Sequence, residues 1–126
     1  MSETILVVDD DPTLVNLMKE DLEAEGYSVL VGYDGQMAVQ MARTNKPSLI
    51  VLDVNMPATS GLKAYEVLHA AGDMRLIPVI FLTGESSQKV PLAAGADARI
   101  AYLRKPIDLE EFNSLVRRML HPTRPS

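Results

Sequence analysis

Five short, almost uninterrupted apolar runs recur along this chain of 126 residues, separated by longer segments whose apolar residues are at helical spacing. The runs consist mainly of aliphatic and β-branched residues, as in strands that are covered on both faces. They are residues 5–8, 27–31, 49–52, 78–82 and 100–103. Short strands that alternate with helical segments indicate right-handed βαβ units, and therefore a parallel sheet. We predict a doubly wound α/β domain with helices on both faces of the sheet.

Local signals mark where the helices between these strands begin and end. Asp11, Asp34 and Asp108 each precede an amphipathic segment and can cap its first turn. Gly26 and Pro47 prevent the first two helices from continuing. The predicted helices lie between residues 12 and 25, 35 and 46, 61 and 71, and 109 and 120.

The segment between Glu85 and Arg99 gives the weakest helical signal. Pro91 and Gly95 lie within it, and each is costly in the interior of a helix. The sequence therefore predicts a short or broken fourth helix, with unusually high mobility around residues 86–98.

Composition and charge exclude several classes of function. The formal net charge is −5, so phosphate backbones and anionic membranes would repel the chain, and we expect no direct nucleic-acid or membrane partner. The absence of cysteine excludes disulfides and thiolate chemistry and fits the reducing cytoplasm, where we expect the protein to be. One domain is predicted over residues 1–120, with residues 121–126 as a tail or the start of a linker.

Polar side chains gather where the predicted strands end. With five strands the natural order is the flavodoxin-like 2-1-3-4-5, and ligands bind at the carboxyl ends of the strands in such folds. Asp9 and Asp10 follow the first strand, Asp53 closes the third, Thr83 closes the fourth and Lys105 follows the fifth. Three carboxylates placed together repel one another unless a cation neutralises them. Oxygen ligands without histidine or cysteine suit Mg²⁺ better than zinc, so the sequence predicts a magnesium site, in which Mn²⁺ can substitute.

These residues stand in four segments: ILVVDDDP at 5–12, LDVNMP at 52–57, VIFLTG at 79–84 and YLRKP at 102–106. The segments resemble the signature segments of the receiver domains of bacterial two-component response regulators, and the resemblance spans nearly the whole chain. It implies that Asp53 accepts a phosphoryl group from a sensor histidine kinase or a phosphotransfer protein. It also implies that Asp9, Asp10, Asp53 and the backbone carbonyl of Asn55 hold the metal, while Lys105 neutralises a phosphoryl oxygen.

The same resemblance implies a conformational switch. The hydroxyl of Thr83 moves to the new phosphoryl group, and the ring of Tyr102 turns from an outward to an inward position, which changes the surface of the fourth helix, fifth strand and fifth helix. Asn55 and Glu85 are expected to help water reach the acyl phosphate. The chain would then be a signalling domain that catalyses its own phosphorylation and dephosphorylation, with an unknown output protein or domain and a possible phosphorylation-dependent homodimer.

Two other functions remain open at this point. The segment from Asp9 to Thr13 also fits the Asp-x-Asp-x-Thr pattern of haloacid-dehalogenase-like phosphatases, with Asp9 as the nucleophile and Asp11 as the general acid. That class needs a downstream acidic pair, and Asp73 has no second acid at the expected distance. A pseudo-receiver that only binds partners would need a damaged pocket, whereas all five strand-end positions carry suitable residues.

Overall fold

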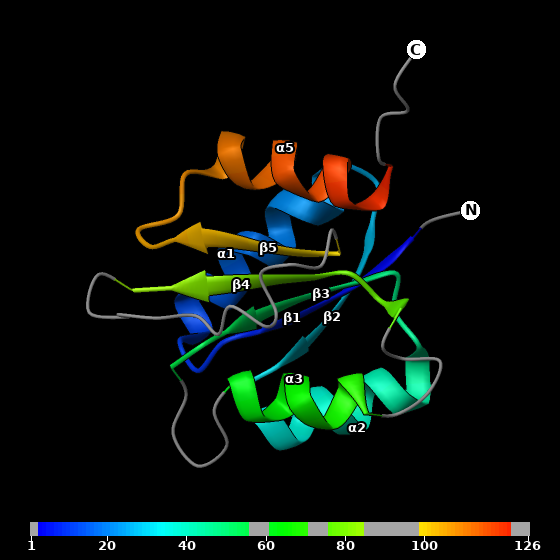
Figure 1. Ribbon diagram of the computed structural model, residues 1–126. Helices are drawn as coiled ribbons and strands as arrows, with labels where there is room; N and C mark the ends of the chain where they lie inside the picture. The colour runs from blue at the N-terminus through cyan, green and yellow to red at the C-terminus, as the bar shows by residue number, and fades with distance from the viewer. Residues whose placement is uncertain (1–2, 56–60, 71–75, 85–98, 122–126) are drawn as a thin grey trace.

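Five parallel strands form the central layer of the molecule, in the order β2-β1-β3-β4-β5 (Figure 1). The computed structural model describes residues 3–55, 61–70, 76–84 and 99–121. The strands are β1 (Thr4–Val8), β2 (Ser28–Gly32), β3 (Leu49–Asp53), β4 (Val79–Thr83) and β5 (Ile100–Arg104). The predicted fold, a flavodoxin-like doubly wound sheet of this order, is confirmed, and each predicted strand differs from the observed one by no more than a residue at either end.

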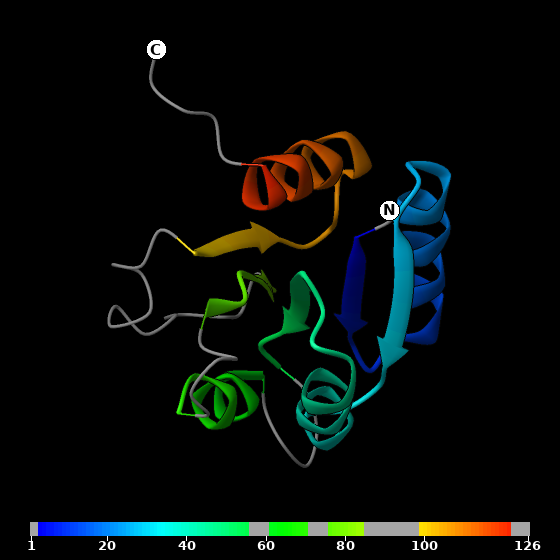
Figure 2. The ribbon, with the colours of Figure 1, turned by 90° about the vertical axis from the view of Figure 1, so that its right-hand side faces the viewer.

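Helices cover both faces of this sheet, as predicted (Figure 2). They are α1 (Pro12–Ala24), α2 (Gly35–Asn45), α3 (Gly61–His69) and α5 (Leu109–Leu120). The helices α1 and α5 lie on one face, which we call the α1/α5 face, and α2 and α3 lie on the other, the α2/α3 face (Figures 1 and 2). The fourth helix expected between residues 85 and 99, and its predicted mobility, fall outside the described residues.

The predicted aspartate caps begin three of these helices. The Oδ1 atom of Asp11 accepts from the backbone N–H groups of the first turn of α1, and Asp34 does the same for α2 at 2.8 Å. Asp108 accepts from two N–H groups at the start of α5. Each cap satisfies donors that have no partner within the helix, and it thereby fixes where the chain leaves the preceding strand.

Two apolar cores result from the alternation of side chains along the strands. On β1, Ile5 and Val7 belong to the core on the α1/α5 face, whereas Leu6 and Val8 belong to the core on the α2/α3 face. The strands β1, β3 and β4 are buried almost throughout, as their apolar sequences predict. The edge strands β2 and β5 are partly exposed, so the expectation that every strand is covered on both faces was wrong for these two.

Candidate functional site

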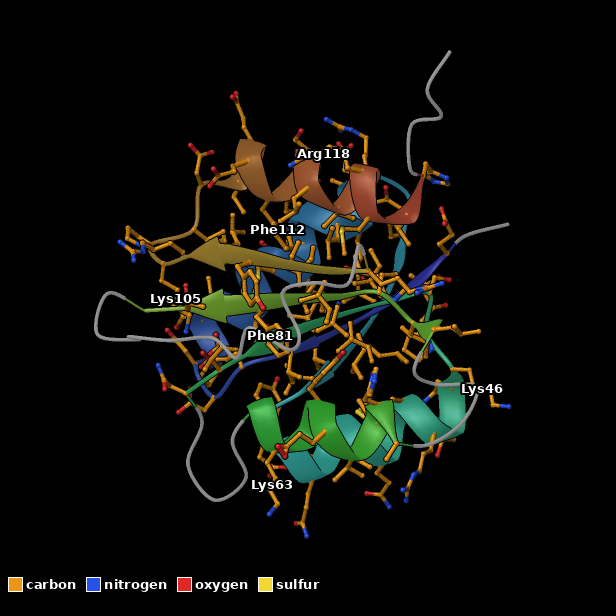
Figure 3. All side chains as sticks on the ribbon, in the orientation of Figure 1. Lys46, Lys63, Phe81, Lys105, Phe112 and Arg118 are labelled. Atoms are coloured by element: carbon orange, nitrogen blue, oxygen red, sulfur yellow. The ribbon has the colours of Figure 1, made fainter. Side chains whose placement is uncertain are left out.

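The predicted site residues lie together at the carboxyl edge of the sheet. Asp53 is the last residue of β3 and Thr83 the last of β4, while Asp9 directly follows β1 and Lys105 directly follows β5. Figure 3 shows Lys105 at the ends of β4 and β5. Because β1, β3, β4 and β5 are consecutive in the sheet, residues about a hundred positions apart in the sequence meet at one place.

Three carboxylates form the acidic part of the site. Oxygen atoms of Asp9, Asp10 and Asp53 lie within 4.8 Å of one another. The side chains of Asp9 and Asp53 are buried, and that of Asp10 is exposed. Local backbone donors orient the buried pair, since Asp9 Oδ1 accepts from the N–H of Asp11 at 3.0 Å and Asp53 Oδ1 accepts from the N–H of Asn55 at 3.2 Å.

Lys105 lies between the two buried carboxylates. Its Nζ atom is 2.8 Å from Asp9 Oδ2 and 3.3 Å from Asp53 Oδ2. The backbone N–H of Lys105 donates to the carbonyl of Thr83 at 2.7 Å, so the lysine is tied to the end of β4. The Lys105–Pro106 peptide bond is cis. The sequence argument gave the neutralisation of the acids to a metal alone, and it missed that this ammonium group already supplies one positive charge.

The surroundings of Asp53 disfavour its charged form. Burial raises the pKa of Asp53, and the negative charge of Asp9 raises it further, while the N–H of Asn55 and the ammonium of Lys105 oppose the change without cancelling it. Burial lowers the pKa of Lys105, but the hydrogen bond and charge of Asp9, with those of Asp53, outweigh this effect, and the pKa is raised. At neutral pH the site therefore holds a protonated lysine beside a carboxylate that is costly to ionise.

We expect Asp53→Asn to raise the melting temperature of the metal-free protein by a few degrees, because it removes this costly charge. A carboxyl group with a raised pKa binds its proton more tightly in the folded state. Its ionisation therefore lowers stability as the pH rises from the ordinary value of 3.8 through the raised pKa. Thermal unfolding in a chelating buffer should show the gain at neutral pH and little gain below pH 3.8, and a loss of stability at neutral pH would contradict this account.

Thr83 and Tyr102 lie on the opposite side of the sheet from the acids. By the alternation of side chains, Thr83 shares the α2/α3 face with Phe81, whereas Asp53 shares the α1/α5 face with Val51. Thr83 is largely buried. The ring of Tyr102 is 36% exposed and stacks on Phe81, with ring centroids 5.7 Å apart. Burial raises the pKa of the Tyr102 hydroxyl.

Of the two residues predicted to assist dephosphorylation, the structure describes only Asn55. The backbone N–H of Asn55 contacts Asp53, and the side chain of Asn55 is exposed beside the acids. Glu85 lies outside the described residues. The proposed roles of both residues stay predictions.

The donor set fits a hard divalent cation. Asp9 Oδ2 is buried, and the Lys105 ammonium lies 2.8 Å from it. This ammonium supplies one positive charge to three clustered carboxylates, so a further cation would lower their mutual repulsion. The side chains that gather here offer only carboxylate oxygens, which Mg²⁺ prefers over softer ligands. Asp9, Asp10 and Asp53 are therefore the residues that could hold the metal.

Within the described ranges, the acidic cluster has no second group of metal-ligating side chains beside it. The cavity of about 780 Å³ between α2 and α3 contains none of the strand-end residues. Along the described ranges, no helix is both long and apolar enough to span a lipid bilayer. The acidic cluster at the sheet edge is thus the site that the chemistry points to.

Comparison with known proteins agrees with this geometry. The family model of the response regulator receiver domain matches residues 5–117. The chain is 39% identical to the response regulator MprA of Mycobacterium bovis over 99% of its own length and 54% of that protein, so it spans about half of such curated relatives.

Solved structures are similar over nearly the whole chain. The chemotaxis protein CheY4 of Vibrio cholerae has a TM-score of 0.86 at 26% identity, with 95% of this chain and 100% of that chain covered. The receiver domain of the sensor histidine kinase PA1611 of Pseudomonas aeruginosa, solved with a magnesium ion in its active-site cleft, has a TM-score of 0.83 at 27% identity, with coverages of 95% and 98%. Fold, strand-end residues and sequence similarity lead to one conclusion: this chain belongs to the receiver domains of two-component response regulators.

Proposed function

We propose that the chain is a phosphoacceptor switch in which Asp53 takes a phosphoryl group in a Mg²⁺-dependent reaction. The observation that carries this proposal is the cluster at the carboxyl edge, where Asp53 lies beside two further aspartates and Lys105. A carboxylate that neighbouring cations neutralise can approach a phosphorus atom that already bears negative oxygens. The donor we propose is the phosphohistidine of a sensor histidine kinase or a phosphotransfer protein.

The contacts of Asp53 assign separate tasks to its two oxygens. Oδ1 accepts from the N–H of Asn55, which fixes the rotation of the carboxylate. Oδ2 points toward Lys105, and it is the oxygen that we assign to attack on phosphorus. A new O–P bond forms as the P–N bond of the donor breaks, and the histidine nitrogen takes up a proton. Lys105 then pairs with an oxygen of the acyl phosphate, because its ammonium is already within ion-pair distance of Asp53.

In the proposed metal site, Asp9, Asp10, Asp53 and the backbone carbonyl of Asn55 hold Mg²⁺ or, as a substitute, Mn²⁺. When bound, the ion supplies positive charge for the carboxylates and the phosphoryl oxygens. Asp9 is oriented for this task by the N–H of Asp11, which leaves its Oδ2 directed at the cluster. The exposed side chain of Asp10 provides a ligand that needs little rearrangement of the core.

We expect Asp10→Asn to weaken Mg²⁺ binding by about tenfold or more, because it removes one anionic oxygen ligand. Isothermal titration calorimetry with MgCl₂ measures the affinity directly. Asp11→Asn is the matched control, since it removes a charge from the same loop while asparagine can still cap α1. Equal losses in the two variants would show that general electrostatic attraction, and not coordination by Asp10, accounts for binding.

The proposed switch uses Thr83 and Tyr102. Thr83 closes the strand next to Asp53, and its hydroxyl would donate to the new phosphoryl group. Tyr102 lies on the same face of the sheet, on the neighbouring strand β5, so it can respond to the movement of Thr83. Asn55 and Glu85 are proposed to assist the attack of water on the acyl phosphate.

The contacts of Asp11 disfavour the phosphatase alternative. A general acid must be within reach of the leaving group, but Asp11 Oδ1 accepts from the N–H groups of Thr13 and Leu14 and caps α1. Asp9 is also the partner of Lys105 at 2.8 Å, which suits a metal ligand or counter-ion better than a nucleophile. A pseudo-receiver is disfavoured because the described site residues are all of the types that the reaction needs.

The phosphorylated domain must pass its signal to a partner. We propose that residues 1–120 form the receiver unit and residues 121–126 a tail or the start of a linker. Output then passes to a separate protein or a further domain. Homodimerisation on phosphorylation is one form that this output could take, and light scattering with and without a phosphoryl mimic on Asp53 would detect it.

A further inference from the structure

A continuous series of aromatic contacts leads from Tyr102 to the outer side of α3. Phe81 stacks on Tyr102, and the ring of Tyr65 meets Phe81 edge to face with centroids 5.3 Å apart. Tyr65 in turn lies 5.4 Å from the ring of His69, and its hydroxyl and His69 Nδ1 form a hydrogen bond of 3.2 Å. We call these four residues the aromatic row.

Spacing in the sequence accounts for two of the three neighbouring pairs in the aromatic row. Phe81 and Tyr102 are register partners on the adjacent strands β4 and β5, so their side chains lie next to each other on one face. Tyr65 and His69 are four residues apart on α3, which puts them on one side of the helix. Figure 3 shows Phe81 on the side of β4 that faces α3.

The two middle residues of the aromatic row, Phe81 and Tyr65, are packed in or against the core, so they cannot move independently of their neighbours. Phe81 is fully buried and belongs to the core on the α2/α3 face, where Tyr65 packs against it. Tyr102 is more exposed and has room to change its rotamer. Because a close-packed core does not leave voids, a rotation of Tyr102 that uncovers one face of Phe81 must be matched by movement of the groups around Phe81.

We propose that Phe81 and Tyr65 are positioning residues of the switch, which couple the rotamer of Tyr102 to the placement of α3 and of His69 on its surface. This inference rests on the proposed function, and it extends it. The resemblance to receiver domains assigns the output to the region of the fourth helix, β5 and α5, whereas the aromatic row leads to α3. Val67 of α3, which is 38% exposed, lines the cavity of about 780 Å³ with α2, so a shift of α3 alters the wall of that cavity.

The two histidines of the chain make a direct test possible. His69 ends the aromatic row on the α2/α3 face, whereas His121 follows α5 on the α1/α5 face, paired with Glu3 at 3.0 Å. Beryllium trifluoride with Mg²⁺ mimics a phosphoryl group on a carboxylate, and fluorine NMR reports its binding independently. We expect the imidazole proton resonance of His69 to shift on saturation, at several values of pH, and this shift is the readout. His121 caps the end of α5, whose surface the proposed switch also changes, so its resonance serves to identify the second histidine signal and not as a fixed control.

Two variants decide whether the signal uses the aromatic row. Tyr102→Leu and Phe81→Leu should bind beryllium trifluoride but lose the shift of His69, and Val67→Ala, on α3 but outside the aromatic row, should keep it. A shift that survives in both leucine variants would show that the signal runs along the chain from Asp53 to α3, and the proposal would be wrong. Binding without any shift in the unmodified protein would also overturn it.

The proposed function and this inference fail in different ways. If no fluorine signal of a bound adduct appears with the unmodified protein and Mg²⁺, the phosphoacceptor proposal fails, and the inference falls with it. If the adduct forms and only the His69 result is negative, the phosphoacceptor proposal stands and the coupling to α3 is rejected. Circular dichroism of Phe81→Leu confirms that the variant is folded, and Tyr102→Leu provides the same test at a more exposed position.

Discussion

Asp53→Asn is expected to abolish formation of the acyl phosphate when the protein is incubated with acetyl phosphate and Mg²⁺. The amide of asparagine is a poor nucleophile toward phosphorus, and it cannot pair with Lys105 as a carboxylate does. Asp9 is the one other buried carboxylate in the described part of the site, and we assign it to the metal. The loss should therefore be complete. Intact-mass spectrometry measures the adduct, and cleavage by hydroxylamine identifies it as an acyl phosphate.

Two further variants separate this outcome from its alternatives. Asp11→Asn should still form the adduct, since Asp11 serves as the cap of α1 and the phosphatase alternative alone needs it as an acid. Asp9→Asn should slow the reaction by weakening the metal site, but the adduct that forms should map to Asp53 by peptide sequencing. An adduct on Asp9, formed equally well by Asp53→Asn, would establish the phosphatase chemistry in place of the receiver chemistry.

Among the proposed variants, we expect Phe112→Ala to destabilise the protein most, with a loss of about 3–5 kcal/mol in the free energy of unfolding. Phe112 is fully buried and holds α5 against the core on the α1/α5 face. Removal of its ring leaves a cavity beneath a helix that has few other large buried side chains. The melting temperature should fall by on the order of 10–20 °C for a domain of this size, as measured by calorimetry.

The control for this prediction separates the core from the helix surface. Phe112→Leu should cost only about 1 kcal/mol, because most of the volume is retained. Leu17→Ala on α1, where the side chain is 44% exposed, should change stability by less than about 0.5 kcal/mol. A similar small loss in all three variants would mean that Phe112 is not an anchor of α5.

The sequence predicted the fold because local and long-range signals agree in it. The apolar runs specify buried strands, and the caps at Asp11, Asp34 and Asp108 specify where helices begin, so few topologies remain. The partial exposure of β2 and β5 was not predicted. Which strands lie at the edges follows from the order of the sheet, and composition alone does not reveal it, because the edge strands SVLVG and IAYLR still consist mostly of apolar residues.

The sequence predicted which residues form the candidate site, but it did not predict how their side chains contact one another. Positions at strand ends brought Asp9, Asp53 and Lys105 to one edge, and the structure places them in contact. The pairing of Lys105 with both acids depends on side-chain rotamers and on the loop after β5, which no pattern in the sequence encodes. The aromatic row was also missed, although the register of β4 and β5 and the four-residue spacing of Tyr65 and His69 would have indicated it.

The position of Lys105 has a consequence for how the folded chain depends on its ion. An ammonium group within 3.3 Å of both buried acids acts as a counter-ion that the polypeptide itself provides. The chain can therefore reach its native state while the divalent site is empty, and it does not need a stored metal to keep the carboxylates together. In the proposed function, the three aspartates would then take up Mg²⁺ from the surrounding pool when the phosphoryl group arrives, so we expect the rate of phosphorylation to follow the free concentration of the ion.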